Sequence, residues 1–289
     1  MEQTSSSSID ARDLQEMALP VLVFGGPYGN YQAVSRLKET ADALGIPGSR
    51  TICTGDTVAY CAQPNETVAA IREWGTHVIS GNVEIQLAAE KDDCGCNFQK
   101  GSVCDALSQH WYAYVRSRLR KEHIHWMGAL PRSLEFTSKG RRFAVVHGTR
   151  SETARYVFRS TEWDVKHREI ELAGADVVIG GHCGLPFIHA ENGKVWANAG
   201  AIGMPANDGT PRVWALLVSA AGGELRLRTF PVDYDFQEAS GRMTGEGLPK
   251  SYAETLISGL WPGCEILPPE ETGRRGIPLE PADVTLFIA

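Results

Sequence analysis

The stretch PVLVFGG, residues 20–26, decides the fold class. An apolar run without polar alternation is typical of a strand that is buried on both faces. Two glycines end the run, and Asn30 then offers a cap for a helix whose apolar residues Val34, Leu37 and Ala41 share one face. A buried strand, a glycine turn and an amphipathic helix together predict an α/β fold.

The same order of elements repeats downstream. Residues 51–53 read as a strand that leads into a loop at 54–56, and residues 66–74 read as a helix ended by Gly75. A further strand at 76–79 stops at the loop 80–82. This order predicts a parallel core sheet whose ligand sites lie just beyond the carboxyl ends of its strands.

Later strands follow one another with fewer helices between them. After a helix around residues 107–115, we expect a hairpin at 134–146, a strand at 176–179 and a second hairpin at 213–232. The sheet is therefore mixed, or two sheets are stacked. We expect residues 1–18 to be disordered or loosely attached, residues 19–242 to form one domain, and the Pro- and Gly-rich tail 243–289, with a short helix near 252–257, to pack on it.

Composition argues against two classes of partner. The chain has 289 residues, with 28 Lys plus Arg against 35 Asp plus Glu, a net charge of −7, so no nucleic-acid partner is expected. No apolar run reaches the roughly 18 residues of a membrane-spanning helix, and the first residues lack the pattern of a secretion signal. We expect a cytoplasmic protein without a membrane partner, and the oligomeric state stays open.

Four polar residues share one pattern. Asp56, Asn82, His147 and His182 each lie in a glycine-flanked loop directly after an apolar strand. Neighbouring parallel strands would bring these loops together at one edge of the sheet. Each residue alone would be ordinary, but a carboxylate, an amide oxygen and two imidazoles together suit Mn, Fe or Zn. The pattern predicts one divalent metal ion.

Five segments resemble the calcineurin-like metallophosphoesterase family, in order and in context: GDTVAY at 55–60, GNVE at 81–84, VHG at 146–148, GHCG at 181–184 and NAGAIG at 198–203. The resemblance covers about residues 20–235. It implies a four-layer α/β sandwich, in which two mixed β-sheets are flanked by helices. It also implies that Asp56, Asn82, His147 and His182 hold the second of the family's two metals.

The chain departs from the family's motifs at the other metal. The family's Asp-x-His falls on Gly26-Pro27-Tyr28, and the second His of its Gly-His-x-His motif is Gly184 here. The resemblance thus implies that one metal site is erased while the other is complete. Val83 also replaces the His that usually assists the leaving group, a contribution of roughly 10²–10⁴-fold. Tyr28 either donates a hydrogen bond near the erased site or only fills its volume.

The resulting hypothesis is a metal-dependent phosphoesterase with a single-metal site. It would hydrolyse a phosphomonoester or phosphodiester of a small molecule, with a water activated by the ion. Asn82 and Arg150 are expected to contact the phosphate, and no residue is assigned as the catalytic acid or base. One alternative is an inactive pseudoenzyme that binds a phosphorylated ligand or a protein partner. Another is a metalloenzyme of altered chemistry in which cysteines join the ligands.

The chain has seven cysteines, and some of them could form a second metal site. A reducing compartment keeps thiols free, so a disulfide framework is not expected. Cys94, Cys96 and Cys104 could bind zinc if Cys61 or Cys183 supplied a fourth ligand, although the spacing differs from the paired Cys-x₂-Cys pattern. The alternative is that these cysteines are small buried hydrophobic residues.

Overall fold

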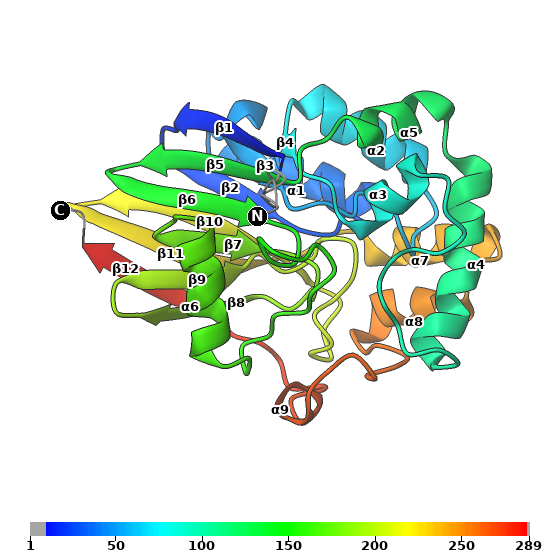
Figure 1. Ribbon diagram of the computed structural model, residues 1–289. Coiled ribbons are helices and arrows are strands. Elements are labelled where there is room, and N and C mark those ends of the chain that lie inside the picture. Colours follow the sequence, from blue (N-terminus) through cyan, green and yellow to red (C-terminus); the bar gives the residue numbers. More distant parts are fainter. Residues whose placement is uncertain (1–9, 288–289) are drawn as a thin grey trace, which may run out of the picture.

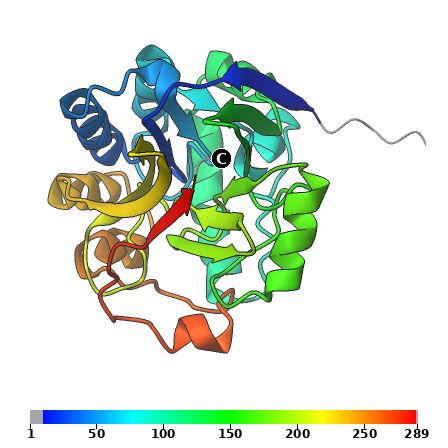
Figure 2. The same cartoon turned by 90° about the vertical axis from the view of Figure 1, so that its left-hand side faces the viewer.

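Two six-stranded sheets lie face to face in the computed structural model, which describes residues 10–287 (Figures 1 and 2). Both contain parallel and antiparallel pairs. In spatial order the first consists of β1 (Ala11–Glu16), β5 (Ser133–Ser138), β6 (Arg141–Val146), β7 (Val177–Gly180), β9 (Lys194–Asn198) and β8 (Phe187–Glu191). The second consists of β12 (Asp283–Phe287), β11 (Glu224–Val232), β10 (Val213–Ala221), β2 (Val21–Phe24), β3 (Thr51–Cys53) and β4 (His77–Val78).

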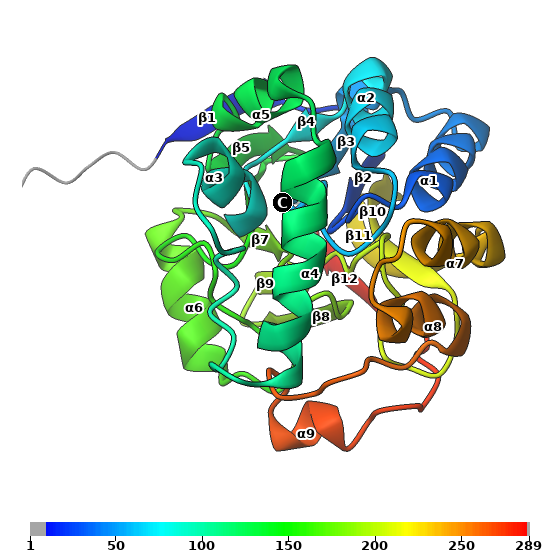
Figure 3. The same ribbon diagram turned by 90° about the vertical axis from the view of Figure 1, so that its right-hand side faces the viewer.

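Helices cover the outer faces of both sheets. Figure 2 shows α6 (Trp163–Leu172) outside the first sheet, with α1 (Tyr31–Ala43) and α7 (Phe236–Gly245) outside the second. The remaining helices are α2 (Pro64–Trp74), α3 (Asn82–Ala88), α4 (Val103–Arg118), α5 (Lys121–Gly128), α8 (Lys250–Ser258) and α9 (Pro269–Thr272). In Figure 3 the long helix α4 crosses one end of the sandwich. The predicted arrangement of two mixed sheets flanked by helices is therefore confirmed.

Strand β2 is buried on both faces, which explains its unbroken apolar sequence. Val21 and Val23 point into the core between the two sheets, while Leu22 and Phe24 point into the core under the helices. All four are completely buried. Asn30 then caps α1 by accepting a hydrogen bond from the Ala33 amide at 3.2 Å, as predicted.

The N-terminal prediction is partly wrong. Residues 1–9 lie outside the described part of the chain, but Ala11–Glu16 form β1, which pairs in parallel with β5 at the edge of the first sheet. The strand exposes most of its side chains, so its stability comes from backbone pairing rather than from an apolar pattern.

The hairpin formed by β8 and β9 was also not predicted from the sequence.

The C-terminal residues contribute to both the sheet and the site. The boundary predicted after residue 242 falls inside α7. Further on, β12 pairs antiparallel with β11 and extends the second sheet. Between α8 and α9 the chain passes over the end of the sandwich, where the Trp261 indole donates a hydrogen bond to the Pro205 carbonyl at 2.7 Å. Over residues 10–287, the helices are too short or too polar to cross a bilayer.

Candidate metal centre

Loops from both sheets converge at one end of the sandwich. Asp56 follows β3, Asn82 begins α3 after β4, His147 follows β6, and His182 follows β7. The loops approach so closely that Gly81 is required, since a β-carbon there would lie 2.2 Å from Oδ1 of Asp56. Asp56 and His182 themselves have positive φ angles of 54° and 48°, a backbone strain of the kind that gathers at functional sites.

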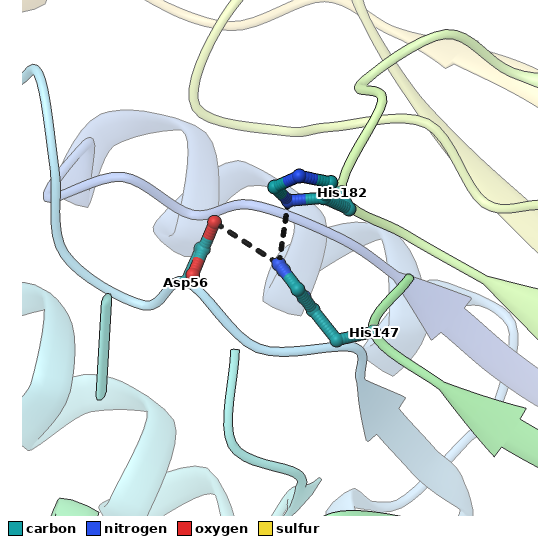
Figure 4. Close-up of side chains that lie close together, drawn as sticks. All are labelled: Asp56, His147 and His182. Carbon is teal, nitrogen blue, oxygen red and sulfur yellow. Dashed lines mark hydrogen bonds and ion pairs between the residues drawn. The ribbon is translucent and has the colours of Figure 1, made fainter. Parts of the chain in front are cut away.

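The imidazole of His147 is the centre of the cluster. Its Nε2 atom lies 3.0 Å from Oδ1 of Asn82, 3.0 Å from Nδ1 of His182 and 3.2 Å from Oδ2 of Asp56. Figure 4 shows Asp56 and His182 turned toward this nitrogen. The structure thus brings together the four residues predicted from the loop pattern.

Hydrogen bonds behind the cluster fix which atoms face it. Nδ1 of His147 is 2.6 Å from the Thr54 carbonyl, which can only accept, so this nitrogen carries the proton and Nε2 presents a lone pair when the ring is neutral. The Asn82 amide nitrogen donates to the Cys94 carbonyl at 2.8 Å and to the Cys96 sulfur at 3.2 Å, which turns Oδ1 toward the cluster. Oδ1 of Asp56 accepts from the Val83 amide at 3.1 Å, which leaves Oδ2 free to face inward.

These directions make the lone pairs of His147, Asn82 and Asp56 converge, and Nδ1 of His182 adds a fourth when the proton of this ring is on Nε2. A single proton on Nε2 of His147 cannot satisfy the other three acceptors together, whereas a divalent cation can bind all four. Within residues 10–287, Asp56, His147 and His182 form the one group of three or more acidic, His or Cys residues whose ligand atoms lie within 4.8 Å of one another. The donor set of two nitrogens and two oxygens therefore fits a divalent ion of the Mn, Fe or Zn type.

The electrostatics of the cluster agree with this reading. Burial opposes charge on Asp56, but the neighbouring His147 holds the pKa of the carboxyl below its usual range. Burial also opposes charge on His147, yet the Asp56 carboxylate raises the pKa of this ring above its ordinary value. Burial and the adjacent His147 lower the pKa of His182 to about 3, so this imidazole stays neutral and able to bind an ion.

Glu84 is the supporting residue that the sequence analysis did not single out. The side chain is completely buried, and its oxygens accept from the amides of Asp56, Thr57 and Gly81 at 2.7–2.8 Å and from the Thr57 hydroxyl at 2.7 Å. Burial and Asp56 raise its pKa. Glu84 therefore clamps the Asp56 loop to the start of α3. The Gly-x-x-Glu spacing of a helix start could have revealed it.

Side chains of this protein fill the other half of the site. A β-carbon on Gly26 would lie 2.2 Å from Cζ of Tyr28, so the tyrosine ring takes the space of a side chain at position 26. A β-carbon on Gly184 would be 3.7 Å from the Trp261 ring. Val83 is buried in the core. Tyr28 therefore fills the volume of the missing ligand, and it also lines the cavity next to Asp56.

The structure does not bring Arg150 to this cluster. Its guanidinium hydrogen-bonds to the Ser133 hydroxyl and forms an ion pair with Glu135 at 3.2 Å, both on β5. Arg150 also does not line the cavity that opens onto Asp56 and His182. The expectation that Arg150 contacts the phosphate rested on its closeness to His147 in the sequence. It is not supported, because the Arg150 side chain points toward β5 instead.

The cysteine loop does not form a second cluster of metal ligands within residues 10–287. The Cys104 thiol lies 3.5 Å from a Glu265 carboxylate oxygen, and Cys96 accepts from the Asn82 amide. A hydrogen bond from Cys96 lowers the pKa of Cys94. Cys94 and Cys96 thus support Asn82 from behind, and Cys96, Cys104 and Cys183 line the cavity.

Comparison with known families agrees with the fold. The model of the calcineurin-like phosphoesterase superfamily domain matches residues 30–221. The match covers more than half of the chain, and the protein belongs to this family.

Three individual proteins are similar over most of their length. An uncharacterized protein of Methanocaldococcus jannaschii is 22% identical over 256 residues, which are 83% of this chain and 98% of that protein. The crystal structure of a hypothetical protein from Pyrococcus horikoshii superposes with a TM-score of 0.71 at 19% identity, covering 84% of this chain and 100% of that one. A metallophosphoesterase from Sphaerobacter thermophilus gives a TM-score of 0.65, also at 19% identity and with the same coverage. The two structures share the fold of this chain.

Proposed function

We propose that this protein is a phosphoesterase that depends on one divalent metal ion held by Asp56, Asn82, His147 and His182. The observation that carries the proposal is the convergence of three acceptor atoms on Nε2 of His147 at 3.0–3.2 Å. A bound divalent ion lowers the pKa of a coordinated water and polarises a phosphoryl oxygen. Membership of the phosphoesterase superfamily supports the assignment of this chemistry to the site.

The chain's own residues orient the ligands and shield them from water. The Thr54 carbonyl fixes the tautomer of His147, and the Cys94 carbonyl fixes the orientation of the Asn82 amide. Tyr156 stacks on His182, with ring centroids 4.3 Å apart, and covers one side of the ligand. Tyr28 lines the cavity with its ring, and burial raises the pKa of its hydroxyl, which therefore stays protonated and able to donate a hydrogen bond.

The lack of a His at position 83 defines the substrates that suit the site. No imidazole is available there to protonate the leaving group, and Val83 is 1% exposed in the core. Aryl esters and other good leaving groups need this help least. We therefore expect turnover of para-nitrophenyl esters, with little turnover of alkyl esters.

Metal analysis and turnover together test the proposal. Protein purified without oxygen, so that iron is retained, should contain close to one ion per chain and should hydrolyse a para-nitrophenyl phosphoester when loaded with Mn²⁺, Fe²⁺ or Zn²⁺. Asp56→Ala and His147→Ala should lose both the ion, by at least about 100-fold in affinity, and the turnover. Asp92→Asn is the matched control, because the Asp92 side chain is 95% exposed. Two tightly held ions, or turnover that survives both alanine variants, would contradict the proposal.

A second candidate is a binding protein that has lost turnover. Tyr28 against Gly26 favours it, because this ring takes the space of a ligand of the first ion. Such a protein would bind its ion and a phosphorylated ligand without hydrolysing any ester. One bound ion with no turnover across an aryl phosphoester panel would support this candidate over the first.

A further inference from the structure

The cavity beside the proposed metal centre has an unusual wall for a phosphate site. It opens onto Asp56 and His182, and it measures about 70 Å³. Among the residues that the structure describes, no lysine or arginine lines it. Phosphate sites normally use such side chains to match the charge of the ligand.

Aromatic rings form the wall instead. Tyr28 packs edge-on against Tyr60, with ring centroids 4.9 Å apart, and the ring centroids of Tyr60 and Tyr252 are 4.8 Å apart. Tyr156 continues the wall over His182, and Trp261 also lines the cavity. An uncharged organic group packs well against such a surface, because its apolar area leaves water there.

The net charge of the site indicates which ligand charge it favours. A divalent ion brings two positive charges, and Asp56 and Glu84 each bring one negative charge, because Glu84 accepts hydrogen bonds through both oxygens. The sum is zero before a ligand enters. The phosphate of a monoester has a second pKa of about 6, so at pH 8 a phosphomonoester adds two negative charges to the site, whereas a phosphodiester adds one. Each uncompensated charge is costly where water is largely excluded.

We propose that the ligand of this site is a phosphodiester with one negative charge and a small uncharged ester group that packs against the tyrosine wall. This proposal rests on the phosphoesterase function above and narrows its substrate class. The Tyr28 hydroxyl and a bound ion would be the groups available to the phosphoryl oxygens, and the rings of Tyr60 and Tyr252 would contact the ester group. The small cavity limits that group to a few atoms while Trp261 stays in place.

A matched pair of substrates tests the charge preference. Para-nitrophenyl phosphate and methyl para-nitrophenyl phosphate share a leaving group and differ by one methyl group, which removes one negative charge at pH 8. The metal-loaded protein should show a kcat/KM at least about tenfold higher for the methyl diester. The ratio should fall when the pH drops to 5, because the monoester then carries a single charge. Equal or preferred use of the monoester at pH 8 would overturn the inference and leave the phosphoesterase function intact.

A binding measurement separates this inference from the proposed function. Calorimetric titration of the metal-loaded protein should give a dissociation constant at least about tenfold lower for dimethyl phosphate than for methyl phosphate at pH 8. If neither para-nitrophenyl ester is hydrolysed, the proposed function fails, and this titration still decides the ligand's charge. Tighter binding of methyl phosphate, or no binding of either compound, would overturn the inference.

An inserted charge provides the final control. Ile266 lines the cavity and is half-buried, so Ile266→Arg can bring a guanidinium to it. This variant should shift the ratio of diester to monoester use by at least about tenfold toward the monoester. Ile266→Gln, which is polar but uncharged, should keep the wild-type ratio. An unchanged ratio in Ile266→Arg, with the ion still bound, would overturn the charge argument.

Discussion

The two halves of the site contrast sharply. In the half that contains the proposed ligands, Asp56, Asn82 and His147 each use their outer polar atom in a hydrogen bond to the backbone and direct their inner atom toward the cluster. In the other half, Tyr28 packs on Gly26 and Trp261 approaches Gly184. A core that merely lost polar ligands would keep a void, which is costly. The space beside Gly26 is thus packed by Tyr28, while a cavity remains between Tyr28 and Trp261.

This contrast gives the two halves different sensitivities to mutation. A polar ligand in the first half is oriented by its supporting hydrogen bonds, so mutation of a residue that makes one of these bonds should disturb the geometry of the whole cluster. A side chain in the second half depends on shape, so adding back a family ligand disturbs packing before it can bind an ion.

The largest effect is expected behind the first half, at Glu84. Glu84→Gln replaces an acceptor oxygen with an amide that donates, although every partner of Glu84 in this clamp is itself a donor. We expect a loss of about 2–4 kcal/mol in the free energy of unfolding, measured in urea, and a metal affinity lower by roughly 10–100-fold. Glu122→Gln is the control, because its side chain is 62% exposed. Equal stability of the two variants would show that the clamp is dispensable.

In the second half, Gly26→Asp should be harmful on its own. Its β-carbon would lie 2.2 Å from Tyr28, and the φ angle of 38° at this position disfavours side chains. We expect a destabilisation of about 1–3 kcal/mol in a urea titration. The double variant Gly26→Asp with Tyr28→His should be more stable than the sum of the single effects by at least about 1 kcal/mol. Strict additivity would mean that Tyr28 does not fill this space.

Much of the fold and of the first half could be predicted from sequence, because local patterns encode them. β2 is an unbroken apolar run, and the four residues each follow a strand in a glycine-flanked loop. Parallel pairing brings Asp56 near Asn82 in one sheet and His147 near His182 in the other, and the face-to-face packing of the two sheets brings the two pairs together. The family motifs then predicted which four residues would form the cluster, and whether they hold one ion stays a prediction.

The second half could not be predicted in the same way. Trp261 belongs to a Pro- and Gly-rich segment without periodic pattern, so its place over Gly184 depends on tertiary packing. Strand β1 has few apolar side chains and is held by backbone pairing to β5. The turn of Arg150 toward Glu135 likewise depends on an ion pair between distant residues.

The protonation states of the first half predict how metal binding responds to pH. An ion must displace the proton from Nε2 of His147, whose pKa is raised by Asp56, while the pKa of His182 is lowered to about 3. The apparent affinity should therefore fall about tenfold for each pH unit as the pH drops through the raised pKa of His147, a slope of one proton rather than two. Competition with a metal-sensitive dye between pH 5 and 9 measures this slope. A slope of two protons would show that His182 is protonated as well.

The smallest effect is expected at Trp261, which lines the cavity of the second half. Trp261→Ala removes the ring beside Gly184 and the hydrogen bond to Pro205, so the cavity becomes larger at a stability loss of about 1–2 kcal/mol. The ratio of kcat/KM for bis(para-nitrophenyl) phosphate to that for methyl para-nitrophenyl phosphate should rise by about three- to tenfold, because the larger ester group then fits. Trp163→Ala is the control, since Trp163 is also half-buried but packs against His189, away from the cavity. An equal rise in both variants would mean that general loosening, rather than the ring of Trp261, admits the larger ester.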